Sequence, residues 1–163
     1  MGPSGSGKST IGAQLARALG VEFIDGDALH PPPNVARMAA GIPLTDDDRR
    51  DWLLVIAARL RDAKRRGVGL VVASSALKRK YRDLLRAKGG GARRVQFVYL
   101  KGPRSLLADR MARRRGHFMP PSLLDSQLET LEEPSPDEGT WVCDINQPPD
   151  AIVAELVKRA TAE

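Results

Sequence analysis

Two kinds of apolar spacing alternate along the chain. Short apolar runs typical of buried β-strands lie at residues 21–24, 68–74, 95–102 and 140–146. Apolar residues at helical spacing predict helices at residues 11–19, 34–41, 46–67, 78–88, 103–115, 123–132 and 149–160. Strands that alternate with helices through short connections are typical of a parallel sheet covered by helices, which binds ligands at the carboxyl ends of its strands.

The helix predicted at residues 46–67 has the clearest boundaries. Acidic residues at 46–48 favour its N-terminal end, and basic residues at 64–66 favour its C-terminal end before Gly67. Its expected buried stripe consists of Trp52, Leu53, Ile56, Ala57 and Leu60.

The first ten residues, MGPSGSGKST, contain a phosphate-binding motif. Gly2, Gly7, Lys8 and Ser9 fill the Walker A pattern G-x-x-x-x-G-K-[ST]. Glycines let the backbone wrap a polyphosphate, Lys8 would reach its β- and γ-phosphates, and Ser9 would offer its hydroxyl to Mg²⁺. A flexible Gly/Ser linker is the alternative, but an amphipathic helix follows at once. The predicted nucleotide-binding residues are Gly2, Pro3, Ser4, Gly5, Ser6, Gly7, Lys8, Ser9 and Thr10.

A Walker A loop is expected to follow a hydrophobic strand, and only Met1 precedes Gly2. About five buried apolar side chains would then be absent, at a cost on the order of 10 kcal/mol. We expect the natural protein to start upstream, with Met1 at the end of the first strand. Restoring that strand would give a sheet of five. The predicted fold class is α/β, a three-layer α/β/α P-loop fold with a parallel sheet and with its first strand largely missing.

Composition limits the classes of function. The 163 residues suit one domain, residues 1–163, and no apolar run approaches the length of a membrane span. We expect a cytoplasmic protein with no membrane partner. Cys143 is the only cysteine, which excludes an intrachain disulfide and a cysteine-built zinc site. The net charge of +6 raises nucleic acid as a partner, but aromatic residues make up only 4% and acids are mixed with the bases, so we predict no nucleic-acid binding.

Candidate groups for phosphoryl transfer surround the Walker A motif in the predicted fold. Asp25 and Asp27 follow the strand at 21–24, and on an extended chain their side chains would point the same way. Asp25, with Ser9, is the candidate Mg²⁺ ligand, and Asp27 is the candidate acceptor of the substrate's proton. The alternative is a pair of turn aspartates that cap the next segment.

Basic residues mark a second candidate region. Arg110 and Arg114 lie one helical turn apart before a proline-rich stretch, and we predict a mobile lid at about 113–136 that closes these arginines over the γ-phosphate. The alternative is a solvated basic face, and Arg113 and Arg115 are expected at the surface. His30 and His117 lack metal-ligand spacing, although His30 gains interest from its place beside Asp27.

Longer stretches carry a resemblance to a family. The segments DGDALHPPPN, SSALKRKYRDLLR and RRRGHFMPPSLLDSQ, with GPSGSGKST before them and DINQPPDAIV after them, resemble the bacterial gluconokinases of the small P-loop type over essentially the whole chain. The resemblance implies transfer of phosphate from ATP, with Mg²⁺, to the 6-hydroxyl of D-gluconate on a fold related to shikimate and nucleoside monophosphate kinases. It also makes a homodimer plausible.

The resemblance further implies residue roles. It implies a sugar-acid site lined by Asp27, His30, Arg37, Arg49 and Lys78. The segment NQPP, with Gln147 and Pro148, resembles one that meets adenine. Three alternatives stay open at this point: a kinase for another small acid such as shikimate, a nucleotide-binding module without catalysis, and a poorly folded fragment.

Overall fold

A computed structural model describes residues 1–113 and 122–162 of the chain. Among these residues, the α-helices are α1 (Lys8–Leu19), α2 (Pro32–Ala39), α3 (Asp46–Arg66), α4 (Arg79–Gly89), α5 (Arg104–Arg113), α6 (Leu123–Thr130) and α7 (Pro149–Thr161). The strands are β1 (Glu22–Asp25), β2 (Leu70–Ala73), β3 (Val98–Lys101) and β4 (Trp141–Asp144), and two short 3₁₀ helices are η1 (Gly26–Leu29) and η2 (Pro136–Glu138). The predicted order of strands and helices is confirmed.

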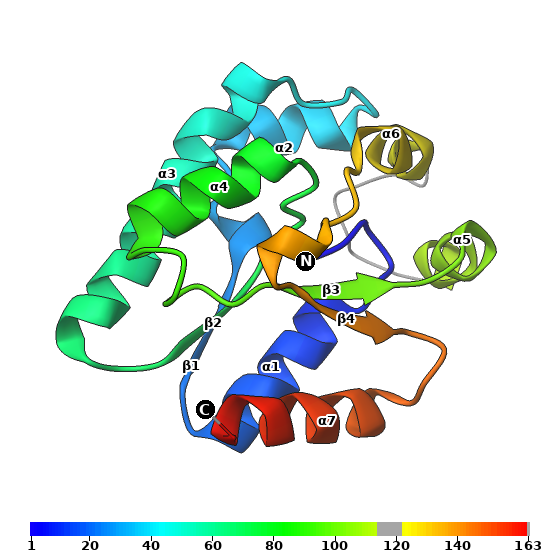
Figure 1. Ribbon diagram of the computed structural model, residues 1–163. Coiled ribbons are helices and arrows are strands. Elements are labelled where there is room, and N and C mark those ends of the chain that lie inside the picture. The colour runs from blue at the N-terminus through cyan, green and yellow to red at the C-terminus, as the bar shows by residue number, and fades with distance from the viewer. Residues whose placement is uncertain (114–121, 163) are drawn as a thin grey trace.

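The strands form the middle of three layers. Helices α1 and α7 pack together on one face, and α3 and α4 pack together on the other (Figure 1). All pairing is parallel, with Phe23 of β1 beside Val71 of β2 and Tyr99 of β3 beside Val142 of β4. The α/β P-loop architecture predicted from the sequence is therefore present, and the Walker A loop enters α1 at the carboxyl ends of the strands.

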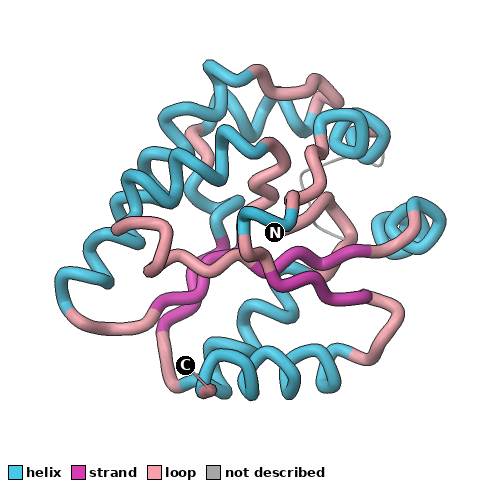
Figure 2. Tube along the Cα trace, viewed as in Figure 1, coloured by secondary structure: helices cyan, strands magenta, loops and turns pink. Residues whose placement is uncertain are grey.

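The sheet is divided into two pairs of strands, at the place where the sequence predicts that a central strand is missing. Among the described residues the strands form two separate pairs, β1–β2 and β3–β4 (Figure 2). Met1 and Gly2 link them, because the Leu100 N–H donates to the Met1 carbonyl at 3.0 Å and the Gly2 N–H donates to the Ser75 carbonyl at 3.2 Å. The four strands predicted within this chain are all present among the described residues, and only Met1 and Gly2 stand where the missing first strand was expected.

A cavity of about 320 Å³ lies behind those two residues, between β2 and β3. Most of its lining is apolar and comes from both pairs of strands and from the helices on both faces, and it includes Ile11, Leu15, Ile56, Val72, Leu85, Phe97, Leu100 and Leu156. The Met1 α-amino group donates to the Val98 carbonyl at this place. Burial, and secondarily the nearby Lys8 charge, lowers the pKa of that amine from 8.0 to about 5.

Helix α3 forms as its sequence predicts. The Thr45 hydroxyl accepts from the Asp48 N–H, and the Asp48 carboxylate accepts from the Thr45 N–H, which makes a capping box. Gly67 ends the helix with a φ of 68°, which a glycine adopts at little cost. Trp52, Leu53, Ile56 and Ala57 are buried as expected and pack against α4 residues Tyr81 and Leu85.

Cys143, the one cysteine of the chain, is free and buried in β4. Within the described ranges, no helix is long and apolar enough to cross a bilayer.

Candidate active site

The Walker A loop has the backbone that its glycines predict. Gly2, Gly5 and Gly7 all have positive φ values, and a Cβ on Gly5 would lie 2.7 Å from the Leu107 carbonyl oxygen. Helix α1 begins directly after Gly7, so its positive end faces the loop. The Ser6 hydroxyl is buried in the loop, and it is among the described side-chain atoms that lack a hydrogen-bond partner. Such a loop suits an oxyanion.

A cavity of about 330 Å³ opens beside this loop. Its lining includes Gly5, Ser6, Gly7, Thr10, Arg110, Ile145, Gln147 and Pro149. The Arg110 guanidinium donates to the Ile145 carbonyl at 2.9 Å, which holds it at the cavity. The structure therefore brings together the loop, Arg110 and Gln147, while Pro148 only caps α7 beside them. Arg114 and His117 lie outside the described residues.

Ser9 and Asp25 meet at the loop's far end. The Ser9 hydroxyl donates to Asp25 Oδ2 at 3.0 Å, and Asp25 Oδ1 accepts from the Asp27 N–H at 3.1 Å. Hydroxyl and carboxylate oxygens are ligands that Mg²⁺ accepts, and Mg²⁺ commonly takes its remaining ligands from phosphates and water. In the described part of the chain, no cluster of three or more His, Cys, Asp or Glu side chains could hold a metal alone. The Ser9 hydroxyl and the Asp25 carboxylate therefore fit an Mg²⁺ ion that arrives bound to a nucleotide.

The acidic turn differs from the extended form expected. Asp25 ends β1, but Asp27 lies in η1, so the chain turns between them. The Asp25 side chain caps η1, so the capping alternative holds for this residue alongside its place at Ser9. Gly26 is required here, because a Cβ would lie 2.3 Å from the Ala73 carbonyl oxygen. Trp52 Nε1 donates to the Gly26 carbonyl at 2.7 Å and fixes the turn against α3.

His30 follows the turn and stacks on Trp52, with ring centroids 4.1 Å apart. The Asn34 amide nitrogen lies 3.3 Å from His30 Nδ1. Because that nitrogen can only donate, Nδ1 accepts and the ring proton is assigned to Nε2. Burial, and secondarily the Arg49 charge, lowers the pKa of His30 from 6.5 to about 4. The ring is therefore neutral at pH 7.

The basic residues predicted for the sugar-acid site lie on two networks of hydrogen bonds and ion pairs. Arg49 donates to the Tyr81 hydroxyl at 3.0 Å, and Lys78 pairs with Asp46 at 3.0 Å. The Tyr81 hydroxyl donates to the same Asp46, so it joins Arg49 to Lys78. Hydrogen bonds from Lys80, Tyr81 and Lys78 keep the pKa of Asp46 far below its usual range. This network joins the start of α3 to the start of α4.

Arg37 belongs to the second network. It faces Asp48 at 3.8 Å with 49% of its side chain exposed. Asn34 links this pair to His30, because its amide donates to the Asp48 carbonyl at 2.7 Å. The structure therefore connects His30 and Arg37 through α2 and the start of α3.

Several residues of the site escaped prediction. Trp52 was assigned only to the buried stripe, and Asn34, Asp46 and Tyr81 had no assigned role beside the substrate residues. Gln127 of α6 was also missed: its side-chain oxygen accepts from the Ser4 N–H at 2.7 Å, which ties α6 to the Walker A loop. The motifs DGDALHPPPN, KRKYRD and LLDSQ contain Asn34, Tyr81 and Gln127, and these motifs were the available signal.

His30 is expected to make stability depend on pH. Its folded-state pKa of about 4 lies below the ordinary 6.5. Between pH 4 and pH 6.5 the unfolded chain therefore binds a proton at His30 that the folded chain does not bind. The contribution of the neutral ring to the free energy of unfolding is complete above pH 6.5 and is lost as the pH falls toward 4. Lowering the pH from 7 to 5 should reduce the melting temperature of the wild type more than that of His30→Gln, by on the order of 5 °C.

The measurement is a thermal melt of both proteins at the two pH values. The Met1 amine titrates in the same way in both, so it cancels in the comparison. Equal decreases in the two proteins would contradict the burial of a neutral His30.

Known proteins resemble this chain in sequence and in fold. A family model described as an AAA domain matches residues 1–134. The gluconokinase of Gluconobacter oxydans (strain 621H) is 47% identical over 163 residues, which cover 100% of this chain and 90% of that protein. The crystal structure of a sugar kinase from Janibacter sp. HTCC2649 has a TM-score of 0.89 and 47% identity, covering 97% of this chain and 90% of that one. The structure of a gluconokinase from Sinorhizobium meliloti 1021 has a TM-score of 0.83 and 53% identity, covering 95% and 85%.

Proposed function

The chain belongs to the gluconokinase family, and from this premise we propose that it transfers the γ-phosphoryl group of ATP to the 6-hydroxyl of D-gluconate, giving 6-phosphogluconate and ADP. The observation that carries the proposal is the hydrogen bond of 3.0 Å between Ser9 of α1 and Asp25 of β1. It joins the Walker A loop to the acidic turn, so a nucleotide and an acceptor hydroxyl would meet there.

The nucleotide side of the site supports ATP as the phosphoryl donor. In our proposal the loop from Gly2 to Thr10 wraps the phosphates and Lys8 neutralises the charge on them. Gln147, which lines the cavity next to the loop, and its neighbour Pro148 would lie beside the base. Ser9 and Asp25 would hold Mg²⁺, directly or through water, and the ion would bridge the β- and γ-phosphates.

The acceptor side supports a hydroxylated acid. We assign Asp27 as the group that takes the proton of the 6-hydroxyl. At the same time the oxygen of that hydroxyl bonds to the γ-phosphorus, and the bond from that phosphorus to the β–γ bridging oxygen breaks. A neutral His30 with its proton on Nε2 can donate to a sugar hydroxyl. Arg37 and Arg49 can grip the carboxylate, and Lys78 adds a third positive charge.

Arg110 contributes charge from the far side of the nucleotide cavity. Its guanidinium stands at the Walker A loop, 3.9 Å from the position that a Cβ on Gly7 would take. We propose that Arg110, with Arg114 and the lid at about 113–136, covers the transferred phosphoryl group and excludes water. Arg113 does not share this role, because 79% of its side chain is exposed and it pairs with Asp109 on its own helix. A homodimer stays a prediction that sedimentation velocity can test.

The test of the proposed function is ADP release by the purified protein with Mg²⁺ and ATP, followed in parallel with gluconate, with shikimate and with no acceptor. ADP release with gluconate should be at least roughly hundredfold faster than with shikimate, because buried polar groups that pair with the hydroxyls of one acceptor stay unpaired with the other. ADP release that is indifferent to the acceptor would overturn the assignment, and so would a preference for shikimate.

A further inference from the structure

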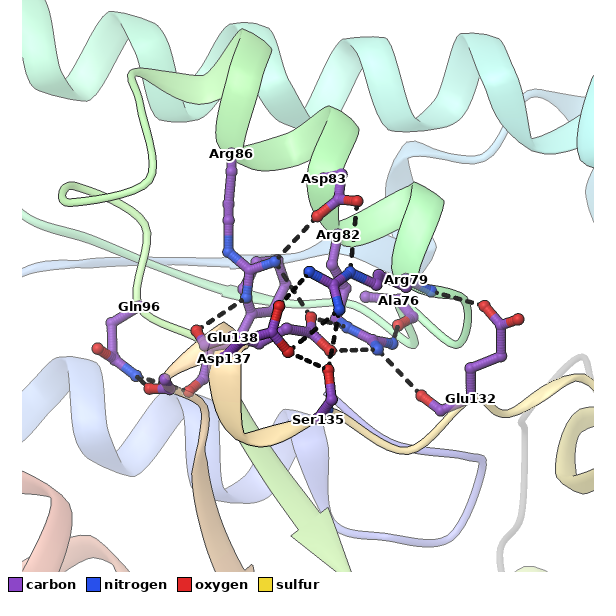
Figure 3. Close-up of polar contacts among 12 residues, drawn as sticks. Ala76, Arg79, Arg82, Asp83, Arg86, Gln96, Glu132, Ser135, Asp137 and Glu138 are labelled. Carbon is purple, nitrogen blue, oxygen red and sulfur yellow. Dashed lines mark hydrogen bonds and ion pairs between the residues drawn. The ribbon is translucent and has the colours of Figure 1, made fainter.

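A buried arginine lies behind the acceptor side of the site. Arg82 of α4 has a fully buried side chain, and all five of its N–H groups are engaged (Figure 3). It holds both carboxylate oxygens of Glu138, at 2.8 and 2.9 Å. Its remaining N–H groups donate to the carbonyls of Ala76, Leu77 and Glu132, at 3.0, 3.2 and 3.0 Å.

Glu138 matches this arginine in burial and in bonding. Only 1% of its side chain is exposed, and it also accepts from Arg86 and from the Ser135 N–H, each at 3.1 Å. Hydrogen bonds from Arg82, and then from Arg86, lower the pKa of Glu138 to about 2. Removing two charges from water costs free energy that an apolar pair would not incur, so stability alone gives little reason for such a pair.

Two of the carbonyls that Arg82 holds, those of Ala76 and Leu77, belong to the turn that precedes Lys78. Ala76 has a φ of 45°, the only positive φ among the described residues other than glycine, and its side chain is fully buried. Such a backbone needs support, and Arg82 and the Glu132 N–H, which donates to the Leu77 carbonyl at 2.8 Å, supply it. Lys78 then occupies the N-cap position of α4 and pairs with Asp46, in the same network as Arg49.

The same arginine reaches the segment after α6. Glu132 lies two residues beyond the end of that helix, whose Gln127 contacts the Walker A loop through Ser4. The loop also meets the Ala76 turn directly, because the Gly2 N–H donates to the Ser75 carbonyl. Arg82 therefore stands where the turn before Lys78 and the exit from α6 are joined.

We propose that Arg82 is a positioning residue for phosphoryl transfer. Paired with Glu138, it fixes the strained Ala76–Leu77 turn to the exit of α6 and so holds Lys78 and the Asp46–Tyr81–Arg49 network at the distance from the Walker A loop that the acceptor needs. The pair touches neither nucleotide nor acceptor and acts through that turn. The role rests on the proposed function, because it concerns the acceptor side of the same site.

Arg79 offers a matched control. It reaches the same segment from the surface, where it pairs with Asp137 and contacts Ser135, and 46% of its side chain is exposed (Figure 3). Its side chain holds no carbonyl of the Ala76 turn among the described contacts. Arg79→Lys therefore weakens the surface attachment and leaves the turn alone, whereas Arg82→Lys keeps the buried charge and removes the planar fork.

The experiment measures KM for gluconate, kcat, the affinity for ADP by calorimetry, and the melting temperature. Wild type, Arg82→Lys, Glu138→Gln and Arg79→Lys are compared. Arg82→Lys should raise KM for gluconate about tenfold or more, since a displacement of about 1 Å remote from the chemistry is enough for such losses. Its ADP affinity should stay within about twofold. Glu138→Gln, which keeps the shape of the side chain, should also raise KM for gluconate, but by a smaller factor. Arg79→Lys should match wild type in both KM for gluconate and ADP affinity.

The outcomes separate the two proposals. A wild type that does not turn over gluconate overturns the proposed function, and the role of Arg82 falls with it. If the wild type is active, two results overturn the positioning role alone. One is an Arg82→Lys variant whose KM for gluconate is unchanged. The other is an Arg82→Lys variant whose KM for gluconate and dissociation constant for ADP rise by the same factor. If Arg82→Lys does not fold, Glu138→Gln decides by the same comparison.

Discussion

Replacing Asp27 with asparagine is expected to lower kcat for gluconate phosphorylation by roughly 10²–10⁴-fold, the range that a positioned general base contributes. Asparagine keeps the size of the side chain and its capacity to hydrogen-bond, but it cannot take the proton of the attacking hydroxyl. The fold of the turn should survive, because the Asp27 backbone N–H, rather than its side chain, makes the bond to Asp25 that closes η1. KM for ATP should therefore change little.

Two comparisons make this prediction specific. Asp51→Asn alters an exposed carboxylate on α3 and should behave as wild type. Asp25→Asn removes the carboxylate that meets Ser9 and should instead raise the Mg²⁺ concentration needed for half-maximal activity. Steady-state kinetics at varied gluconate, ATP and Mg²⁺ measures all three. An Asp27→Asn enzyme that keeps more than about a tenth of wild-type kcat would exclude Asp27 as the base.

Local signals explain what could be predicted from the sequence. Helix α3 was predicted at 46–67 and observed at Asp46–Arg66, because the acids that start it and the glycine that ends it act within one turn. The Walker A loop was predictable for the same reason. Strands β2, β3 and β4 are shorter than their apolar runs, as with 68–74 against Leu70–Ala73, because a ladder extends only where a neighbouring strand offers partners.

Contacts between distant segments explain what could not be predicted. Arg82 stands in the basic run KRKYRD and reads as a surface residue, yet it is fully buried because Glu138, 56 residues away, neutralises it. The turn between Asp25 and Asp27 forms because Gly26 meets the Ala73 carbonyl and Trp52, neither of which is near in sequence. Burial and partners of this kind arise from topology, whereas spacing along the chain reports only faces and ends.

Five apolar residues attached in front of Met1 are expected to stabilise the protein strongly. The cavity of about 320 Å³ between β2 and β3 is lined mostly by apolar side chains, and Met1 already pairs with β3 at its end. An extended segment such as five alternating Val and Ile residues would enter parallel to both strands and join the two pairs into one sheet. Filling a cavity of this size is worth on the order of 5 kcal/mol, which corresponds to at least about 10 °C in melting temperature.

A second effect must be separated from the filling of the cavity. Any added residue converts the buried Met1 amine, whose pKa is lowered to about 5, into an uncharged amide. Because that folded pKa lies below the ordinary 8.0, the amine destabilises the fold increasingly as the pH falls from 8 to 5, and every extended variant loses this dependence. Five residues of Gly and Ser in the same place share the amide but not the apolar side chains. Thermal melts of the chain and of both extensions at pH 8 therefore isolate the strand: a gain confined to the apolar extension indicates that it fills the cavity, while equal gains in both would mean that only the amine mattered.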